Sequence, residues 1–388
     1  MAKTPQLASR RPAFQKALHA WYRGHHRKLP WREAPSLYST VVSEFMLQQT
    51  QVATVLPYFD RWLRELSGFA ALAAASEAKV MKLWEGLGYY SRVRNLHKLA
   101  QAVVKLPAPP RTPAEWRELP GIGPYTAAAI TSISFGEPFA CVDGNVVRIL
   151  ARLTGEGRLF RDGSAAAKHF TPLADMLIKG SNPGEHNQAM MELGATVCLR
   201  QNPRCMVCPL AEFCAARKSG EPGKFPRLKP KLIEQRAVIR VWCEHRGKLL
   251  LRRGHAKARR LAGLHELPEL IDLGLSLRGA RKGDEAIHLD RDECISLGGH
   301  ARQGRARDDK TKVTLLAVKR RTITRFQITE SIYRTSLTPA LRKLIAKSDS
   351  LEWVPFKQLD RVTLSGPHRR WIGELRAIKV VRGAPDAH

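Results

Sequence analysis

The sequence has no apolar run long enough to cross a lipid bilayer. A membrane-spanning helix needs about 20 consecutive apolar residues, and no stretch of the 388 residues approaches that length. No short apolar segment with a small-residue cleavage site follows the N-terminus. We therefore expect a protein that does not enter a membrane and that stays in the compartment where it is made.

Acidic residues are scarce relative to basic ones. The chain has 35 Asp and Glu against 65 Lys and Arg, which leaves a formal net charge of +30. Such an excess attracts polyanions, and nucleic acid is the commonest polyanion in the cytosol. A solvated basic surface and a membrane-facing patch are the alternatives, but the basic residues are spread along the whole chain rather than along one amphipathic helix. The composition favours a protein that binds nucleic acid.

The few cysteines are unevenly placed. Three of the seven stand alone, at Cys141, Cys243 and Cys294. The other four, in a C-x6-C-x2-C-x5-C pattern, are Cys198, Cys205, Cys208 and Cys214. An odd number of cysteines argues against a secreted disulfide scaffold. Four thiolates this close in sequence can ligate one [4Fe-4S] cluster, whereas structural zinc sites usually combine two tight C-x2-4-C pairs. The spacing favours an iron-sulfur cluster, with zinc as the alternative.

The residue patterns predict two domains of different kinds. Residues 1–217 read as helices joined by short turns, with a helix cap at Ser76 and a capping box at Thr112. Residues 218–235 are rich in Gly, Pro and Lys, which is typical of an extended connector. Residues 236–388 predict an α/β domain, because short β-rich runs occur at 237–243, 248–251, 313–318 and 322–333. A basic, Gly- and Arg-rich insertion at 275–312 interrupts this domain, and we expect it to form a long loop.

A glycine-containing turn separates two predicted helices at residues 119–126. Gly121 and Gly123 allow a tight backbone turn and can expose backbone amides at a helix N-terminus, where they can bind a phosphate. A plain helix-helix turn that needs glycine is the alternative. In so basic a chain, the pattern favours a DNA-binding hairpin that contacts the backbone and reads no sequence.

Two carboxylates lie in unusual surroundings. Asp143 precedes an apolar helix and is expected to cap it, a role compatible with stabilising a developing cation. We expect Glu44, Gln48 and Gln51 to share one polar edge of an otherwise apolar helix. A solvated edge is the ordinary interpretation. Neutral glutamines are nevertheless unusual on the surface of so charged a protein, and their amides suit the edges of nucleic acid bases.

These segments together resemble the helix-hairpin-helix DNA glycosylases that carry an iron-sulfur cluster, and among them the adenine DNA glycosylases. The resemblance covers about residues 14–217 and implies two helical subdomains with the catalytic cleft between them. The matching segments are Leu29-Pro30-Trp31-Arg32, 43–52, Gly86-Leu87-Gly88-Tyr89-Tyr90, 119–126, Val142-Asp143-Gly144-Asn145-Val146, 187–194 and the four cysteines.

The resemblance implies an enzyme that flips adenine out of duplex DNA and hydrolyses its N-glycosidic bond, where the adenine is mispaired with 8-oxoguanine or G. Glu44 resembles the general acid, in an apolar pocket whose walls we expect to be Leu29, Trp31 and Phe45. Asp143 resembles the carboxylate that stabilises the oxocarbenium ion, by the two-carboxylate logic of glycoside hydrolysis.

Further roles follow from the same resemblance. Asn145 and Tyr125 are expected to support the catalytic site, Arg27, Leu29, Trp31 and Glu192 to hold the base, and Gln49 and Tyr89 to act as wedges in the base stack. Bifunctional relatives carry Lys where this chain has Tyr125, so we expect a monofunctional glycosylase. Arg200 and Arg204 are expected to contact the DNA backbone beside the cluster.

The second domain resembles the Nudix-like domain of the same family through residues 260–268 and 353–356. The Glu-rich helix of Nudix hydrolases does not follow, so nucleotide hydrolysis is not expected. The loop that usually reads Phe-Ser-His reads Ile323-Thr324-Arg325 here. Thr324 and Arg325 are therefore the candidates for recognition of 8-oxoguanine.

The expected partner is double-stranded DNA that contains A:8-oxoguanine or A:G mispairs. The expected protein is a monomer in the bacterial cytoplasm, associated with the nucleoid. Two alternatives remain open from the sequence. One is a glycosylase of the same scaffold that removes mismatched thymine or uracil, or an oxidised pyrimidine. The other is a catalytically silent DNA-binding protein that uses the hairpin and the cluster as structure.

Overall fold

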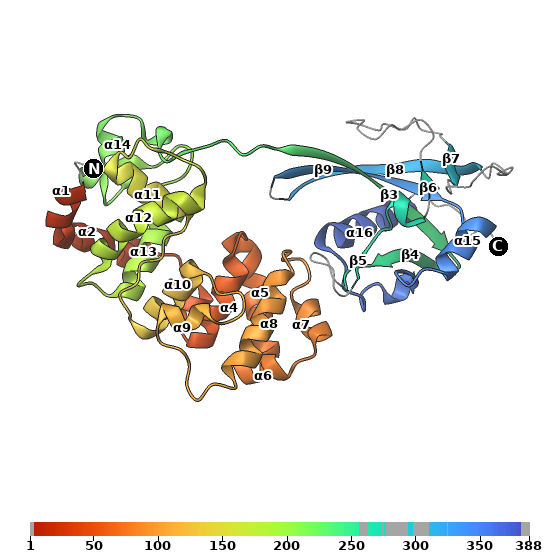
Figure 1. Ribbon diagram of the computed structural model, residues 1–388, viewed down its shortest axis with the longest axis horizontal. Helices are drawn as coiled ribbons and strands as arrows, with labels where there is room; N and C mark the ends of the chain where they lie inside the picture. Colours follow the sequence, from red (N-terminus) through yellow and green to blue (C-terminus); the bar gives the residue numbers. More distant parts are fainter. Residues whose placement is uncertain are drawn as a thin grey trace. The chain divides into compact units, whose positions relative to one another are not determined.

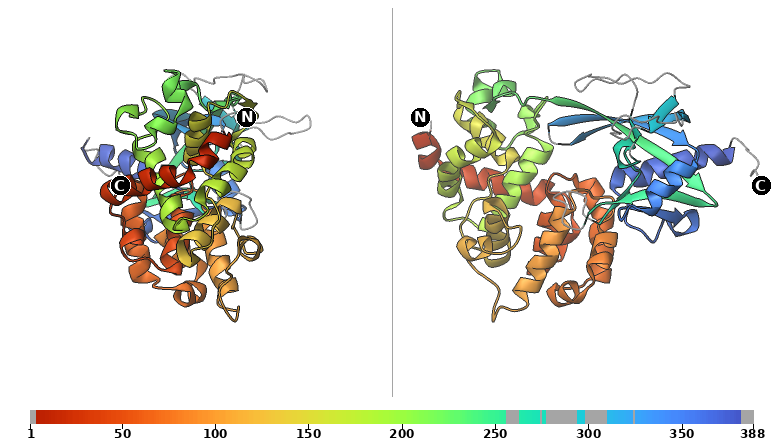
Figure 2. Two further views of the ribbon diagram at one scale, coloured as in Figure 1. Left: turned by 90° about the vertical axis from the view of Figure 1, so that its left-hand side faces the viewer. Right: turned by 45° about the vertical axis from the view of Figure 1, so that its right-hand side comes forward.

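The chain folds into two compact units, which the computed structural model describes over residues 4–255, 263–273, 275–276, 294–297, 310–323 and 325–381. The helical unit comprises Met1–Leu83 and Arg92–Pro230, and the sheet unit comprises Trp84–Ser91 and Lys231–His388 (Figures 1 and 2). The division after Pro230 falls within the connector expected at 218–235. The inclusion of residues 84–91 in the sheet unit was not anticipated from the sequence.

The helical unit consists of two groups of helices (Figure 1). The first group contains α1 (Thr4–Ser9), α2 (Arg11–His25), α11 (Gly144–Thr154), α12 (Gly163–Ile178), α13 (Pro183–Thr196) and α14 (Ala215–Lys218). The second contains α4 (Leu37–Leu47), α5 (Val52–Glu65), α6 (Phe69–Ala74), α7 (Glu77–Leu83), α8 (Ser91–Val103), α9 (Pro113–Arg117) and α10 (Pro124–Phe135). The short α3 (Pro30–Glu33) lies on the connection from the first group to the second.

Side-chain caps fix where several of these helices begin. The capping box predicted at Thr112 is present, since its side chain accepts from the backbone of Glu115 and the Glu115 side chain accepts from the backbone of Thr112. Ser76 accepts from the Lys79 amide before α7, as predicted. Part of the connector after α14 packs on the helical unit, because β2 (Arg227–Leu228) pairs in parallel with β1 (Leu159–Phe160).

The sheet unit confirms the α/β prediction. Its strands are β3 (Glu234–His245), β4 (Lys248–Arg253), β5 (His265–Glu266), β6 (Leu275–Ser276), β7 (Cys294–Leu297), β8 (Lys310–Ile323), β9 (Phe326–Thr335) and β10 (Leu351–Pro355). They are ordered β10-β4-β3-β9-β8-β7-β6, with β5 beside β4. Strands β3 and β9 are parallel, and the other described pairs in this sheet are antiparallel. The β-rich run at 322–333 is divided between the end of β8 and β9, which differs from the prediction of one strand.

Both faces of this sheet are buried. On β3, Val241 and Cys243 pack in a core that includes residues of α15 (Pro339–Ala346), whereas Trp242 packs in a core that includes residues of α16 (Gly366–Val381). Successive side chains of a strand point to opposite faces, so this alternation requires apolar residues at consecutive positions. It explains why the strand reads as a continuous β-rich run.

Residues 84–91 are held within the sheet unit by polar contacts. Glu85 Oε1 accepts hydrogen bonds from the Leu364 amide at 2.8 Å and from Arg369 Nη2 at 2.7 Å. Tyr90 donates its hydroxyl proton to the carbonyl of Leu364 at 3.1 Å. The segment that carries Tyr89 is therefore anchored next to α16.

Among the described residues, no helix is both long enough and apolar enough to span a membrane.

Candidate active site

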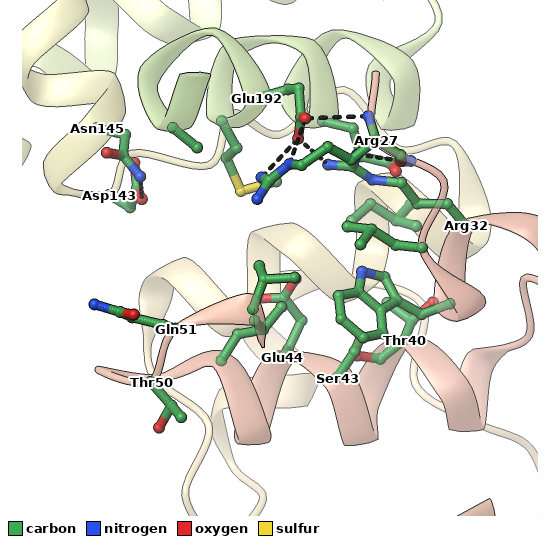
Figure 3. Close-up of a pocket in the computed structure, with 18 of the residues that line it drawn as sticks. Arg27, Arg32, Thr40, Ser43, Glu44, Thr50, Gln51, Asp143, Asn145 and Glu192 are labelled. Carbon is green, nitrogen blue, oxygen red and sulfur yellow. Dashed lines mark hydrogen bonds and ion pairs between the residues drawn. The ribbon is translucent and has the colours of Figure 1, made fainter. Parts of the chain in front are cut away.

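A cavity of about 440 Å³ opens within the helical unit, between side chains from both groups of helices (Figure 3). Glu44 enters it from α4, Tyr125 from α10, Asp143 from the residue before α11, and Glu192 from α13. The segment between α2 and the end of α3 contributes Arg27, Leu29, Trp31 and Arg32. All the catalytic and base-binding residues expected from the sequence, apart from the two wedge residues, line this one cavity.

Glu44 is a carboxyl group in an apolar helix. Only 7% of the residue is exposed, and residues 38–46 of α4 are all buried. The pKa of Glu44 is raised to about 7: burial has the largest effect and the charge of Asp143 acts in the same direction, while the hydrogen bond with Tyr125 and the charge of Arg32 act in the opposite direction. Leu29 and Trp31 line the cavity as expected. Phe45 does not, since it is buried in the interior and lies against Gly121.

Tyr125 remains a protonated phenol. Burial raises its pKa well above the ordinary value, and the charge of Glu44 adds to that effect. Its hydroxyl forms a hydrogen bond with the Glu44 side chain and also lies 2.9 Å from Sδ of Met191. A carboxylate is a much stronger acceptor than a thioether. Tyr125 can therefore stabilise Glu44 once that residue has given up its proton.

Asp143 caps helix α11 and lines the cavity at the same time. Its Oδ1 accepts from the Val146 amide at 2.8 Å, and its Oδ2 accepts from Asn145 Nδ2 at 2.9 Å. Burial raises the pKa of Asp143, whereas these hydrogen bonds favour the ionised form. The capping role predicted from the sequence is confirmed. Figure 3 shows Asp143 and Asn145 at one end of the cavity and Glu44 on the helix below.

Asn145 is fixed by two neighbours that sequence reasoning did not single out. A Cβ atom at Gly194 would lie 2.5 Å from the Cβ of Asn145, so only glycine allows α13 to approach here. Arg148 donates to Asn145 Oδ1 at 2.9 Å and to the Cys198 carbonyl at 2.7 Å. The sequence could have indicated this contact, because Asn145 and Arg148 are three residues apart on one helix. Arg148 thus links Asn145, the hydrogen-bond partner of Asp143, to Cys198, the first cysteine of the cluster loop.

The pKa of Glu192 is shifted in the opposite direction to that of Glu44. Its side chain is completely buried, and it accepts from Arg27 Nε at 2.7 Å and from Arg32 Nη2 at 2.9 Å (Figure 3). Burial would raise the pKa of Glu192, but the hydrogen bond from Arg27 and the charge of Arg32 lower it overall. One cavity thus holds a carboxyl group that tends to be neutral and another that tends to be ionised. Environments that separate two carboxyl groups in this way are typical of acid-base sites.

The polar edge predicted for Glu44, Gln48 and Gln51 is wrong. Helix α4 ends at Leu47, and Gln51 precedes the next helix, α5, as its N-cap residue. Gln51 lines the cavity together with Glu44, whereas Gln48 donates to Thr126 Oγ1 at 3.4 Å. Between them the chain turns at Gln49, which has a φ of 56°.

The two expected wedge residues share an unusual backbone conformation. Gln49 and Tyr89 have φ values of 56° and 47°, in the left-handed region that non-glycine residues seldom adopt. Gln49 is exposed, and Tyr89 is 43% exposed. They are carried by different units, Gln49 by the helical unit and Tyr89 by the sheet unit.

The glycine turn has the form predicted for the hairpin. Gly121 has a φ of 79°, and a Cβ atom there would lie 2.6 Å from the Cβ of Asn95. Gly123 is the N-cap residue of α10, and a Cβ atom built on it would meet no heavy atom within 4 Å. Contact between the amides at the start of α10 and a DNA phosphate stays a prediction.

The four cysteines of the cluster loop converge on one small cavity. Arg152, which is only 2% exposed, donates to Cys198 Sγ at 3.2 Å and to the carbonyls of Leu199 and Pro222 at 2.7 and 2.8 Å. Burial raises the pKa of Cys208 to about 11. A buried cation in hydrogen-bond contact with a sulfur offsets the charge of thiolate ligands.

Four cysteines around one cavity match the ligand set of an iron-sulfur cluster, whose ligands bind different iron atoms. Arg200 and Arg204, expected to meet the DNA backbone, are exposed on this loop.

The residues expected to recognise 8-oxoguanine are only partly described. Thr324 lies outside the described residues. Arg325 is exposed at the turn before β9, and its Nε pairs with Glu234 Oε1 at 2.8 Å. Its guanidinium lies 5.1 Å from the ring centre of Phe326.

Known proteins match the helical unit and the cluster loop. Residues 42–167 match the HhH-GPD superfamily of base excision DNA repair proteins, and residues 198–214 match the iron-sulfur binding domain of endonuclease III. The chain is 44% identical over 227 residues to the adenine DNA glycosylase of Rattus norvegicus, which covers 56% of this chain and 44% of that protein. It is 43% identical over 220 residues to the adenine DNA glycosylase of Homo sapiens, and the match covers 54% of this chain and 40% of that protein. It is 41% identical over 225 residues to the adenine DNA glycosylase of Schizosaccharomyces pombe, and the match covers 52% of this chain and 49% of that protein.

The matched part spans less than half the length of these three relatives. The match at residues 198–214 confirms the prediction of a [4Fe-4S] cluster, and the matched residues include the four cysteines that line the small cavity. The match at residues 42–167 includes Glu44 of α4, the glycine hairpin and Asp143. Residues 42–167 are thus similar to the HhH-GPD base excision DNA repair proteins, and residues 198–214 are similar to the iron-sulfur binding domain of endonuclease III.

Proposed function

We propose that this chain is a DNA glycosylase that excises adenine mispaired with 8-oxoguanine or G in duplex DNA. The observation that carries the proposal is Glu44, a buried carboxyl group whose pKa is raised to about 7 and which faces the same cavity as Asp143. Relatives named adenine DNA glycosylase, at 41 to 44% identity, support the choice of adenine.

The chemistry begins with proton transfer to the base. A pKa near 7 leaves a large fraction of Glu44 protonated at neutral pH, and Glu44 donates that proton to a ring nitrogen of the flipped adenine. The N-glycosidic bond then breaks, and its electron pair leaves with the adenine. Asp143 stabilises the positive charge that develops on the sugar. Water adds to the sugar, and its proton returns to the carboxylate of Glu44, which restores the acid.

The remaining cavity residues bind and orient the base. Leu29 and Trp31 provide apolar walls, and the ion pairs of Glu192 with Arg27 and Arg32 provide fixed polar groups. Extrusion of adenine leaves a gap in the stack, and Gln49 and Tyr89 are the residues proposed to fill it.

The proposed reaction stops at base removal. A glycosylase that also cleaves the strand uses an amine to form a Schiff base with the opened sugar. Tyr125 occupies the corresponding position, and no lysine is among the described residues that line the cavity. We expect release of adenine and an intact abasic strand.

The sheet unit is proposed to inspect the base opposite the adenine. This role rests on the resemblance of residues 260–268 and 353–356 to the Nudix-like domain of the adenine enzymes. Arg325 is the described candidate for the contact, and it must exchange its pairing with Glu234 for the oxidised guanine or a phosphate.

Single-turnover excision from a panel of duplexes tests the proposal. Each duplex carries A, T, U or an oxidised pyrimidine opposite G or 8-oxoguanine. We expect adenine release opposite both partners, with no strand cleavage until alkali is added. Release of a pyrimidine in place of adenine would establish the alternative activity on the same scaffold, and no release from any duplex would identify a DNA-binding protein without catalysis.

A further inference from the structure

The first turn of helix α8 supports the turn that carries Gln49. Arg92, the second residue of α8, is 7% exposed, although an arginine is seldom buried. Its Nη1 donates to the carbonyls of Phe45 and Met46 at 3.1 and 3.0 Å. Nη1 also donates to the carbonyl of Gln48, and Nη2 donates to Thr50 Oγ1 at 3.1 Å.

These acceptors define one structural feature, the end of α4. The last four carbonyls of a helix have no partner within the helix. Here the chain also leaves the helix through Gln49 in the left-handed conformation, without the glycine that commonly permits it. Arg92 binds carbonyls before Gln49 and the hydroxyl of the residue after it. One guanidinium thus holds both sides of the strained residue.

The other hydrogen bonds across this turn are local: the Thr50 amide donates to the Leu47 carbonyl at 3.2 Å, and Thr50 Oγ1 donates to the Gln48 carbonyl at 3.3 Å. The side chain of Gln49 is exposed, so its packing does not impose the backbone conformation. Arg92 does not line the cavity that contains Glu44 and Asp143. A change at Arg92 can therefore alter the shape of the Gln49 turn without removing a group that contacts the base.

The same turn of α8 also touches the glycine hairpin. Asn95, three residues after Arg92, lies against Gly121. A Cβ atom built on Gly121 would be 2.6 Å from the Cβ of Asn95. Helix α8 therefore relates the position of the Gln49 turn to that of the hairpin proposed to contact a DNA phosphate.

We propose that Arg92 is a positioning residue that holds Gln49 in the conformation required to enter the base stack. The inference rests on the proposed function, and it assigns to Arg92 the step in which adenine leaves the stack. Breakage of the glycosidic bond depends on Glu44 and Asp143 and does not involve Arg92.

A double-mutant cycle tests this assignment in the full-length holoprotein. The variants are Arg92→Met, Gln49→Ala and the pair together, with Arg94→Met as the matched control, because Arg94 lies on the same helix and pairs with Glu77 instead. The substrate is a duplex with adenine opposite 8-oxoguanine, at saturating protein and under single turnover. Unstacking is followed by fluorescence in a duplex where 2-aminopurine replaces the adenine.

We expect Arg92→Met to lower both the excision rate and the fluorescence change by about 10-fold, the cost of one residue held in a strained conformation. If Arg92 acts through Gln49, the double variant is no slower than Gln49→Ala alone. The pH dependence of excision stays that of the parent, and Arg94→Met excises at the parental rate. Thr50→Val, which removes the hydroxyl that accepts from Nη2 and donates to the Gln48 carbonyl, shows a smaller loss of the same kind.

Other results would overturn the proposal. Losses that multiply in the double variant mean that Arg92 acts on something other than Gln49. A fluorescence change that is intact while excision falls places Arg92 in the chemical step. A general loss of folding in Arg92→Met, with Thr50→Val indistinguishable from the parent, reduces Arg92 to a structural residue. Failure of the parent protein to excise adenine would instead refute the proposed function.

Discussion

Replacement of Glu44 by Gln changes how the stability of the protein depends on pH. Burial raises the pKa of Glu44 from 4.5 to about 7, so the folded state binds this proton more tightly than the unfolded chain does. The contribution of the protonated carboxyl to the free energy of unfolding is present in full below pH 4.5, declines as the pH rises towards 7 and is lost above it. At about 1.4 kcal/mol per pKa unit, the raised pKa corresponds to about 3 kcal/mol.

Glu44→Gln removes this dependence, because Gln stays neutral at every pH. We expect the variant to gain stability over the parent by about 2 to 3 kcal/mol between pH 5 and pH 8, since most of the titration of Glu44 falls in that range. Urea unfolding of both proteins at these two pH values, followed by helical circular dichroism, measures the difference. The other titrating groups contribute equally to both proteins, so their contributions cancel in the difference between the two free energies of unfolding. Glu118→Gln, which removes an exposed carboxylate, is the control.

A difference between parent and variant that changes by less than about 0.5 kcal/mol over this range would contradict the raised pKa of Glu44, because a surface substitution has effects of that size. Such a result means that the environment of Glu44 does not favour the neutral form. The assignment of Glu44 as the acid would then lose its physical basis.

Three further predictions concern the other parts of the site. Asp143→Asn should lower single-turnover excision by about 100-fold, since it removes a preorganised charge, while the melting temperature stays close to the parent's because Asn also caps helices well. The purified protein should contain about four iron and four sulfide per chain; Cys208→Ser should lower the iron content, and zinc in the parent would contradict the cluster assignment. Replacement of Arg200 and Arg204 by Gln should weaken DNA binding equally for matched and mismatched duplexes, and should reduce the slope of log affinity against log salt by about 0.9 for each phosphate that these arginines neutralise in the parent. A change in which base is excised would show that these arginines do more than bind the backbone.

Features that depend on neighbouring residues were predictable from the sequence. The capping box at Thr112, the cap at Asp143 and the four-cysteine spacing each involve residues close together in the chain, and each is present as expected. The β-rich run at 237–243 lies within β3 (Glu234–His245), so the strand was also predictable from neighbouring residues. The resemblance to the glycosylase family then identified the residues that line the cavity.

Features that depend on distant residues were not predictable. Helix α4 ends at Leu47 instead of continuing to Gln51, because carbonyls near its end are bound by Arg92, more than 40 residues along the chain. The charge state of Glu192 depends on Arg27 and Arg32, which are at least 160 residues away in sequence. No local pattern contains either relationship.

The most direct test of the account is the pH dependence of adenine release. Single-turnover excision from a duplex with adenine opposite 8-oxoguanine is measured between pH 5.5 and pH 9 for the parent and for Glu44→Gln. The account predicts that the parental rate falls as the pH rises through about 7, where Glu44 loses its proton, and that the variant is slow at every pH. A parental rate that does not fall above neutral pH, or a Glu44→Gln protein as fast as the parent, would contradict it.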